Sequence, residues 1–224
     1  MNEFLILYMP PVAAMLVIAV IAHKRLMDSP AYRGWWGEYR VNLMLRLCLS
    51  NDYKILANSI YRGQRKGEST QVDHIVVSRY GIFVIETKTL KGVIKVDSEQ
   101  PSKWVQIVGR RRYLMDNPLK QNYAHLKAIQ HVTGVHAQKI FSYVAMAGTA
   151  TFEGEAPERV YSIWRLVKKI QSNKTPVLTS GGANSVYRRL VVHKIKGGYW
   201  AARRHTARLR SKSGREEQVT EGNP

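Results

Sequence analysis

Two apolar, β-branched runs joined by a short turn constrain the fold of this chain more than any other feature. Residues 71–78 read QVDHIVVS, and residues 82–87 read IFVIET. Tyr80 and Gly81 between them are typical of a turn, so the pattern predicts two successive strands. The second run is apolar almost throughout, which is typical of a central strand covered on both faces.

Helical patterns separate these strands from other apolar runs. We expect helices over residues 35–49, 117–132, 162–170 and 183–195, the second of them because Pro118 suits a first helical turn. Further strands are expected over residues 53–60, 92–96 and 140–147, with a loop over 62–70. Strands that alternate with helices predict an α/β fold with a mixed sheet.

An uncharged apolar run, Phe4–Ala22, lies near the N-terminus. As a helix it would span roughly 28 Å, close to the thickness of a hydrocarbon core. A cleaved signal peptide is the alternative, but such peptides begin with basic residues, and here the basic cluster His23, Lys24, Arg25 follows the run. The positive-inside rule therefore predicts a single-pass anchor over residues 1–27, with the rest of the chain on the cytoplasmic side of the inner or plasma membrane.

The chain is strongly basic, since 35 Lys and Arg against 16 Asp and Glu give a net charge of +19. This charge predicts a polyanionic partner, either nucleic acid or an anionic lipid surface. Arg110, Arg111 and Arg112 precede the expected helix at residue 117, and we expect them to contact nucleic-acid phosphates. Residues 198–224 are predicted to form a flexible basic tail that contacts nucleic acid or anionic lipid. With one cysteine, Cys48, the chain has no internal disulfide framework.

Two acids and a lysine stand where they can carry chemistry. Asp73 lies in the first of the two strands, and Glu86 and Lys88 share a face at the end of the second. A hairpin would bring Asp73 beside Glu86, and two adjacent carboxylates favour Mg²⁺ or Mn²⁺. With Lys88 to orient a water molecule, the pattern predicts phosphodiester hydrolysis. The alternative is that these are ordinary charged side chains at strand ends.

Several separated motifs surround these residues in a fixed order. They are Gly37-Glu38, residues 71–77, residues 80–88, residues 92–94, Trp104, and Asn117-Pro118-Leu119-Lys120-Gln121. Together they resemble the nuclease-related domain (NERD) family of the PD-(D/E)XK nuclease superfamily. The resemblance covers about residues 34–150 and includes the family's conserved tryptophan and its NPxxQ helix start.

The resemblance implies a restriction-endonuclease-like core and a role for each matching residue. Glu38, Asp73, Glu86 and the carbonyl of Thr87 would hold Mg²⁺ or Mn²⁺, Lys88 would be the catalytic lysine, and Gln121 would support the site. Val72 stands where the superfamily motif has its leading proline. Alternatively, Glu38 only stabilises the first turn of its helix through the helix dipole, and Gln121 is an ordinary surface amide.

Other polar residues are expected outside this site. His74 should point to the face of its strand opposite to Asp73, and His125 and His131 are expected to be structural. Trp104 is expected in the core rather than as a platform for bases.

The expected function is that of a membrane-anchored, metal-dependent endodeoxyribonuclease. Residues 30–150 would form the nuclease-like domain, and residues 151–197 an α/β extension packed on it. The alternatives are a catalytically inactive, membrane-tethered module that binds nucleic acid or serves as a scaffold, and a membrane-surface protein whose basic tail binds lipid.

Overall fold

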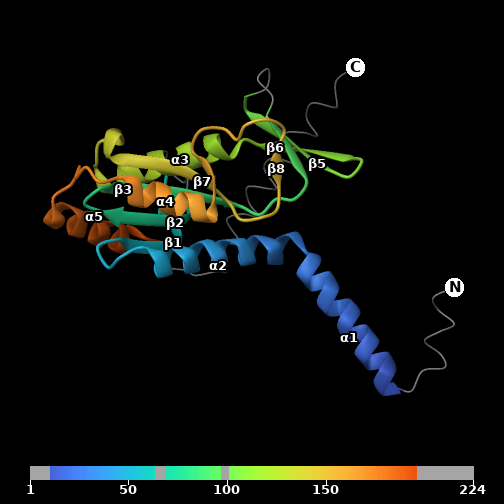
Figure 1. Ribbon diagram of the computed structural model, residues 1–224. Helices are drawn as coiled ribbons and strands as arrows, with labels where there is room; N and C mark the ends of the chain where they lie inside the picture. The colour runs from blue at the N-terminus through green and yellow to red at the C-terminus, as the bar shows by residue number, and fades with distance from the viewer. Residues whose placement is uncertain (1–10, 64–68, 97–100, 196–224) are drawn as a thin grey trace, which may run out of the picture.

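The computed structural model describes residues 11–63, 69–96 and 101–195 (Figure 1). The helices are α1 (Pro11–Asp28), α2 (Pro30–Cys48), α3 (Pro118–Thr133), α4 (Ile163–Ser172) and α5 (Ser180–His193), and a short 3-10 turn covers Ala137–Lys139. The strands are β1 (Lys54–Arg62), β2 (Ser69–Ser78), β3 (Gly81–Lys88), β4 (Val93–Val96), β5 (Lys103–Val108), β6 (Arg111–Asp116), β7 (Ile140–Met146), β8 (Thr151–Phe152) and β9 (Val160–Ser162).

The larger sheet has the strand order β1-β2-β3-β7-β9. β1, β2 and β3 are antiparallel neighbours, whereas β7 and β9 continue the sheet in parallel with β3. Helices α2 and α4 pack on one face, and α3 and α5 pack on the other. Because β3 is covered on both faces, nearly all of its side chains are buried, as its apolar sequence predicts. The predicted α/β fold with a mixed sheet is confirmed.

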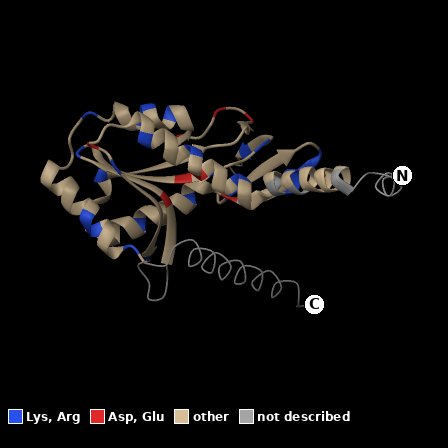
Figure 2. Ribbon diagram, turned by 90° about the horizontal axis from the view of Figure 1, so that it is seen from below, with Lys and Arg blue, Asp and Glu red and all other residues tan. Residues whose placement is uncertain are grey.

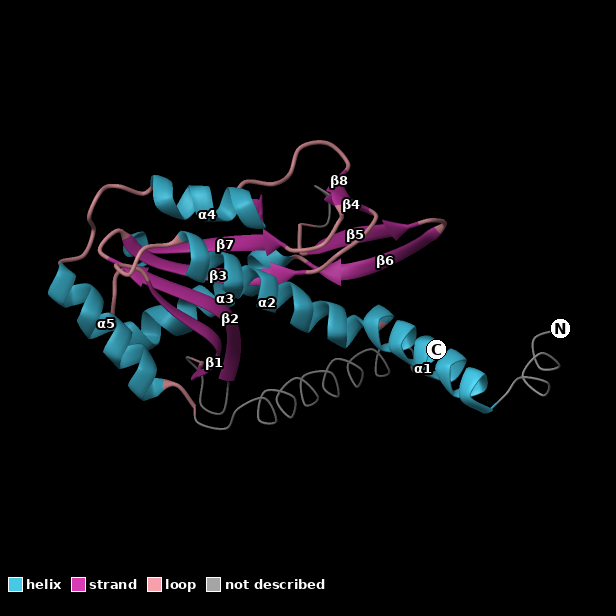
Figure 3. Ribbon diagram, turned by 60° about the horizontal axis from the view of Figure 1, so that its bottom comes forward, coloured by secondary structure: helices cyan, strands magenta, loops and turns pink. Residues whose placement is uncertain are grey.

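A smaller sheet with the order β6-β5-β4-β8 extends beyond the end of the larger one (Figure 3). Trp104 is fully buried at its base among Ile94, Val144 and Val160, so its expected place in the core is confirmed. The sequence did not predict β5 and β6. Nearly every residue of β6 is exposed, so the strand lacks the alternation of apolar and polar residues that marks a half-buried strand.

Helix α2 begins earlier than the expected residue 35. The Ser29 side chain accepts a hydrogen bond from the backbone N–H of Tyr32 at 3.2 Å, and Pro30 occupies the first turn, where no N–H is needed. Val41 and Leu45 then pack on the larger sheet. The backbone of Gly37 lies against Thr89 and Ala147, and this close approach places the following residue, Glu38, near the end of β3.

The predicted membrane anchor is not supported by the structure. Helix α1 includes Lys24, Arg25 and Asp28 in its second half, and among the residues described no helix has the length and apolar character needed to cross a membrane. Residues 4–10 of the predicted apolar run lie outside the described residues, as does the whole of the predicted tail, 198–224.

Residues 151–195 add to both sheets, since β8 pairs with β4 in the smaller one. β9 pairs with β7 at the edge of the larger sheet, and α4 and α5 cover its opposite faces. The division into domains at residue 150 stays a prediction.

We expect the substitution Gly37→Ala to destabilise the protein. A Cβ at this position would overlap the hydroxyl of Thr89 and lie 3.2 Å from the Cβ of Ala147, so α2 would have to move outward. Overpacking of this kind costs about 1–3 kcal/mol, more than the helix propensity that alanine gains. Urea unfolding measures the change.

Gly34→Ala is the matched control, because a Cβ at Gly34, one turn earlier on the same helix, meets no atom within 4 Å. That variant should be about as stable as the wild type or slightly more stable. Equal effects of the two substitutions would show that close packing at Gly37 is not what holds α2 in place.

Candidate functional site

Asp73 and Glu86 lie opposite each other at the end of the β2–β3 hairpin. In the register of strands β2 and β3, His74 lies opposite Ile85, so the next position along each strand brings Asp73 and Glu86 opposite each other. Ile75 and Val84, two residues away on each strand, pack in the cluster beneath α3 and α5. Since side chains two apart share a face, both acids lie on the α3 side of the sheet.

Both carboxylate oxygens of Glu86 are bound by cationic or polar neighbours. Lys88 Nζ lies 2.7 Å from Oε1, and His125 Nε2 lies 3.1 Å from Oε2. The side chain is buried, and burial alone would raise its pKa. The hydrogen bond with His125 and the charge of Lys88 outweigh burial, so the pKa of Glu86 is lowered and the group is ionised.

The role expected for His125 is therefore corrected. It was expected to be structural, yet it contacts Glu86 directly, and its Nδ1 lies 2.6 Å from the hydroxyl of Thr70. With its proton on Nε2, the ring donates to Glu86 and accepts from Thr70. His125 follows Gln121 by four residues, so the two lie on one face of α3, and this spacing was a signal that the sequence offered.

Lys88 is held between two of the predicted site residues. Its ammonium group donates to Gln121 Oε1 at 2.8 Å as well as binding Glu86. Helix α3 carries Gln121 in its first turn, where the Asn117 side chain accepts from the N–H of Leu119 at 2.9 Å. The structure thus brings Glu86, Lys88 and Gln121 together.

Asn122 fixes α3 on the sheet. Its buried side-chain amide donates to the carbonyls of Val84 in β3 at 2.9 Å and of Tyr143 in β7 at 2.8 Å. The sequence did not single out this residue, because an asparagine on a helix carries no signal that it will bind two neighbouring strands.

Glu38 reaches the same group of charges from α2. Burial raises the pKa of Glu38 to about 7. A hydrogen bond with the side chain of Asn58 acts in the opposite direction, and the charge of Glu86 raises the pKa further. Burial also raises the pKa of Asp73, and the charges of Glu86 and Glu38 add to that effect. The three acids therefore act on one another electrostatically.

The sheet is irregular beside Asp73. Asn58 of β1 has a left-handed backbone (φ 47°) and interrupts the pairing between Ala57–His74 and Ser59–Val72. On the β3 side, Asp73 Oδ2 accepts a hydrogen bond from the backbone N–H of Thr87 at 2.8 Å. Asn58 is a further site residue that the sequence did not reveal, because an isolated left-handed residue within a strand has no pattern of its own.

His74 occupies the opposite face, as expected. It is fully buried, its Nδ1 lies 3.4 Å from the hydroxyl of Thr87, and burial lowers the pKa of His74 to about 4. The ring is neutral at physiological pH, so it adds no positive charge beside the acids.

The carboxylates of Glu38, Asp73 and Glu86 are the kind of ligand that a hard divalent cation binds, but they are not arranged around one point. Among the described residues no group of three His, Cys, Asp or Glu is arranged to hold a metal ion. Mg²⁺ needs only one or two carboxylates and keeps several waters. Buried acids that raise one another's pKa are the groups that a cation would stabilise in their ionised form.

Arg110–Arg112 lie at the β5–β6 hairpin of the smaller sheet. They are exposed at the turn of the β5–β6 hairpin, with Arg112 five strand residues before Asn117, a distance of roughly 17 Å along the strand. Figure 2 shows basic residues spread over helices and strand ends. Contact of these three arginines with phosphate stays a prediction.

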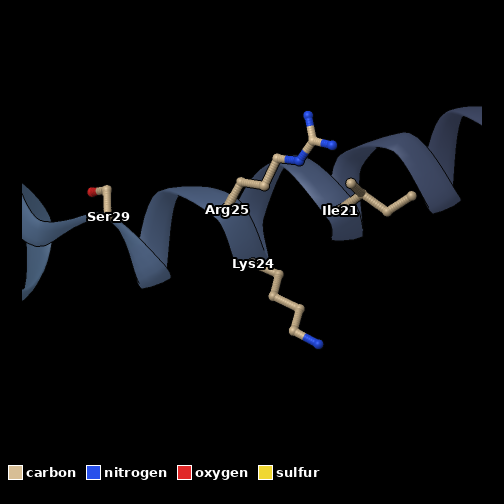
Figure 4. Close-up of a pocket in the computed structure, with 4 residues that line it drawn as sticks. All are labelled: Ile21, Lys24, Arg25 and Ser29. Carbon is tan, nitrogen blue, oxygen red and sulfur yellow. The ribbon is translucent and has the colours of Figure 1, made fainter. Parts of the chain in front are cut away.

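Two surface hollows lie away from these acids. One is lined by Ile21, Lys24, Arg25 and Ser29, where the chain passes from α1 to α2 (Figure 4). Another is lined by residues between 155 and 172. Neither includes the acids, so these hollows carry no argument about the site.

An antiparallel hairpin that presents an acid opposite an E-x-K triplet, with a further acid on the preceding helix, is consistent with the PD-(D/E)XK class of nucleases. The chain belongs to the nuclease-related domain family, whose model matches residues 33–147. An uncharacterized protein of Bacillus anthracis is 35% identical over 129 residues, which are 57% of this chain and 58% of the relative. The match thus spans less than two thirds of that relative's length. No solved structure matches the chain.

We expect Glu38→Gln to stabilise the protein at alkaline pH when divalent cations are absent. A carboxyl whose pKa rises to about 7 on folding binds protons more tightly in the folded state, so stability falls as pH rises from about 4.5 to 7. The amide removes this penalty, which amounts to about 3 kcal/mol at pH 8 and about 1 kcal/mol at pH 5.

Urea unfolding in EDTA at both pH values measures the difference. Glu155→Gln, at an exposed acid, is the control and should change stability by less than about 0.5 kcal/mol at either pH. A gain from Glu38→Gln that is the same at pH 5 and pH 8 would contradict the burial of an ionisable Glu38 beside Glu86.

Proposed function

We propose that this protein is a metal-dependent nuclease that hydrolyses phosphodiester bonds, with DNA as the favoured substrate. One observation carries the proposal: Asp73 and Glu86 face each other on one side of a hairpin, and Lys88 bridges Glu86 and Gln121. Membership of the nuclease-related domain family and a net charge of +19 support a nucleic-acid substrate.

Asp73 and Glu86 would hold Mg²⁺ or Mn²⁺, with Glu38 and the carbonyl of Thr87 as further ligands. A bound cation of this kind polarises a phosphoryl oxygen and lowers the pKa of a water molecule. The chain's own residues do the rest. His125 fixes the orientation of Glu86, and Lys88 donates hydrogen bonds to the attacking water or to the scissile phosphate. Gln121 holds the ammonium group in place for this task.

Membrane attachment is a separate part of the proposal. The described part of the apolar run, in α1, exposes large apolar side chains that include Leu16, Ile18 and Ile21, and Lys24 and Arg25 follow them. Attachment through residues 4–22 would leave the nuclease domain on the cytoplasmic face of the inner or plasma membrane.

Fractionation of cells that express the full chain with a C-terminal reporter tests this attachment. We expect the chain in the membrane pellet after alkaline carbonate extraction, with the reporter inaccessible from outside the cell. Release by carbonate, or an external reporter, would contradict attachment and would leave the nuclease proposal unaffected.

A catalytically inactive nucleic-acid-binding module is the second candidate. The observation that favours it is that both oxygens of Glu86 are already engaged, by Lys88 and His125. Calorimetric titration with Mg²⁺ separates the two candidates, because a nuclease requires metal binding that Asp73→Asn abolishes.

We expect Asp73→Asn, Glu86→Gln and Lys88→Met each to lower cleavage of DNA in Mg²⁺ by roughly 100-fold or more, because each removes charge from the reacting centre. Gln121→Ala should lower the rate less, by about 10-fold, since Lys88 keeps its contact with Glu86. Gel assays on labelled DNA measure these rates.

Asp116→Asn and Lys95→Met are matched controls on the smaller sheet, where both side chains are exposed, and they should cleave like the wild type. A wild-type chain that cuts no form of DNA or RNA in Mg²⁺ or Mn²⁺ would refute the proposal. Site variants that cleave at the wild-type rate would refute it equally.

A further inference from the structure

Three exposed aromatic side chains form a cluster on α2, which we call the α2 aromatic cluster: Trp35, Trp36 and Tyr39. The rings of Trp35 and Tyr39 have centroids 5.8 Å apart and lie within 18° of parallel, and those of Trp36 and Tyr39 are 5.4 Å apart and within 20°. Each side chain is 44–49% exposed. Such stacked, solvent-facing rings offer flat apolar surface that the fold itself does not use.

The cluster begins directly beside Glu38. At about 100° per residue, Trp35 and Tyr39 lie roughly 60° and 100° round the helix from Glu38, on the side away from the buried Val41. Glu38 therefore stands between the buried face of α2 and the aromatic cluster.

Basic side chains accompany the aromatic ones on α2. Arg33 precedes the cluster, and Arg40, whose guanidinium group donates to the carbonyl of Ala147 at 3.1 Å, follows it. Arg46 lies two turns further on, and Glu38 is the acid of this helix. Arg46 is exposed, with its guanidinium group held by Asn42 at 3.1 Å. Aromatic faces next to arginines are the combination that binds single-stranded nucleic acid, because bases stack on the rings and the cations contact phosphates.

We propose that the α2 aromatic cluster is a stacking platform for unpaired bases beside the site of cleavage. The substrate class is then single-stranded nucleic acid, or the unpaired part of a branched or gapped duplex. A continuous duplex cannot use the platform, because its bases already stack on one another. This proposal rests on the proposed nuclease function, since it assigns the substrate class of the same site.

The test compares the double variant Trp35→Leu/Tyr39→Leu with Trp164→Leu. Trp164 on α4 is the matched control, because it is 52% exposed and its ring contacts Lys168 rather than the acids. The full chain in detergent, with EDTA to prevent cleavage, is titrated into fluorescein-labelled oligothymidylate and into a duplex of equal length. Fluorescence anisotropy gives the dissociation constants.

We expect the double variant to bind oligothymidylate about 10-fold or more weakly, with less than about a 2-fold change for the duplex. Trp164→Leu should change neither. Because the replaced side chains are exposed, all variants should unfold at the wild-type temperature, and a shared melting curve checks this.

The proposal would be overturned if the double variant bound oligothymidylate and duplex DNA equally more weakly than the wild type, or if neither affinity fell. Unchanged oligothymidylate binding together with weaker association with phosphatidylserine vesicles would also overturn it, since the cluster would then be a lipid contact. Cleavage in Mg²⁺ is measured separately. A wild type that binds oligothymidylate through the cluster but cuts nothing refutes the nuclease function, whereas cleavage with unselective binding refutes the platform.

Discussion

The buried carboxylate of Glu86 is the group on which the rest of the site depends. It stays ionised because Lys88 and His125 each bind one of its oxygens. Burial raises the pKa values of Asp73 and Glu38, and the charge of Glu86 raises them further. The site therefore brings three acids together near the end of one hairpin, where each disfavours the ionisation of the others. The divalent cation that we propose would relieve this repulsion.

Two helices hold these charges from opposite faces of the sheet. Helix α2 approaches closely through Gly37 and brings Glu38 inward, while α3 is fixed by Asn122 and presents Gln121 and His125. Glu38, Gln121 and His125 all lie within these helices and not in loops. Side chains on regular elements packed against a sheet are held more rigidly than loop residues, which suits a reaction that requires fixed geometry.

The sequence predicted the hairpin, its acids and the helix start at Asn117, because apolar runs, strand periodicity and a proline at the first helical turn are local signals. Asn58 could not be placed in the same way, because its role depends on a contact with Glu38 of another element that no local pattern encodes. His125 shares a face of α3 with Gln121, but its partner Glu86 is a long-range contact that the spacing alone does not name. The hairpin β5–β6 was missed because β6 is exposed and so lacks an alternating pattern. The anchor expected over residues 1–27 rested on an apolar run followed by basic residues, and part of that run lies outside the described residues.

The most direct test of the account is a crystal of the full chain soaked in MnCl₂, with anomalous diffraction used to locate the metal. The account predicts one manganese ion bound by carboxylate oxygens of both Asp73 and Glu86, at distances of about 2.1 Å. A soaked crystal in which Glu86 keeps both Lys88 and His125 while no ion touches Asp73 would contradict it.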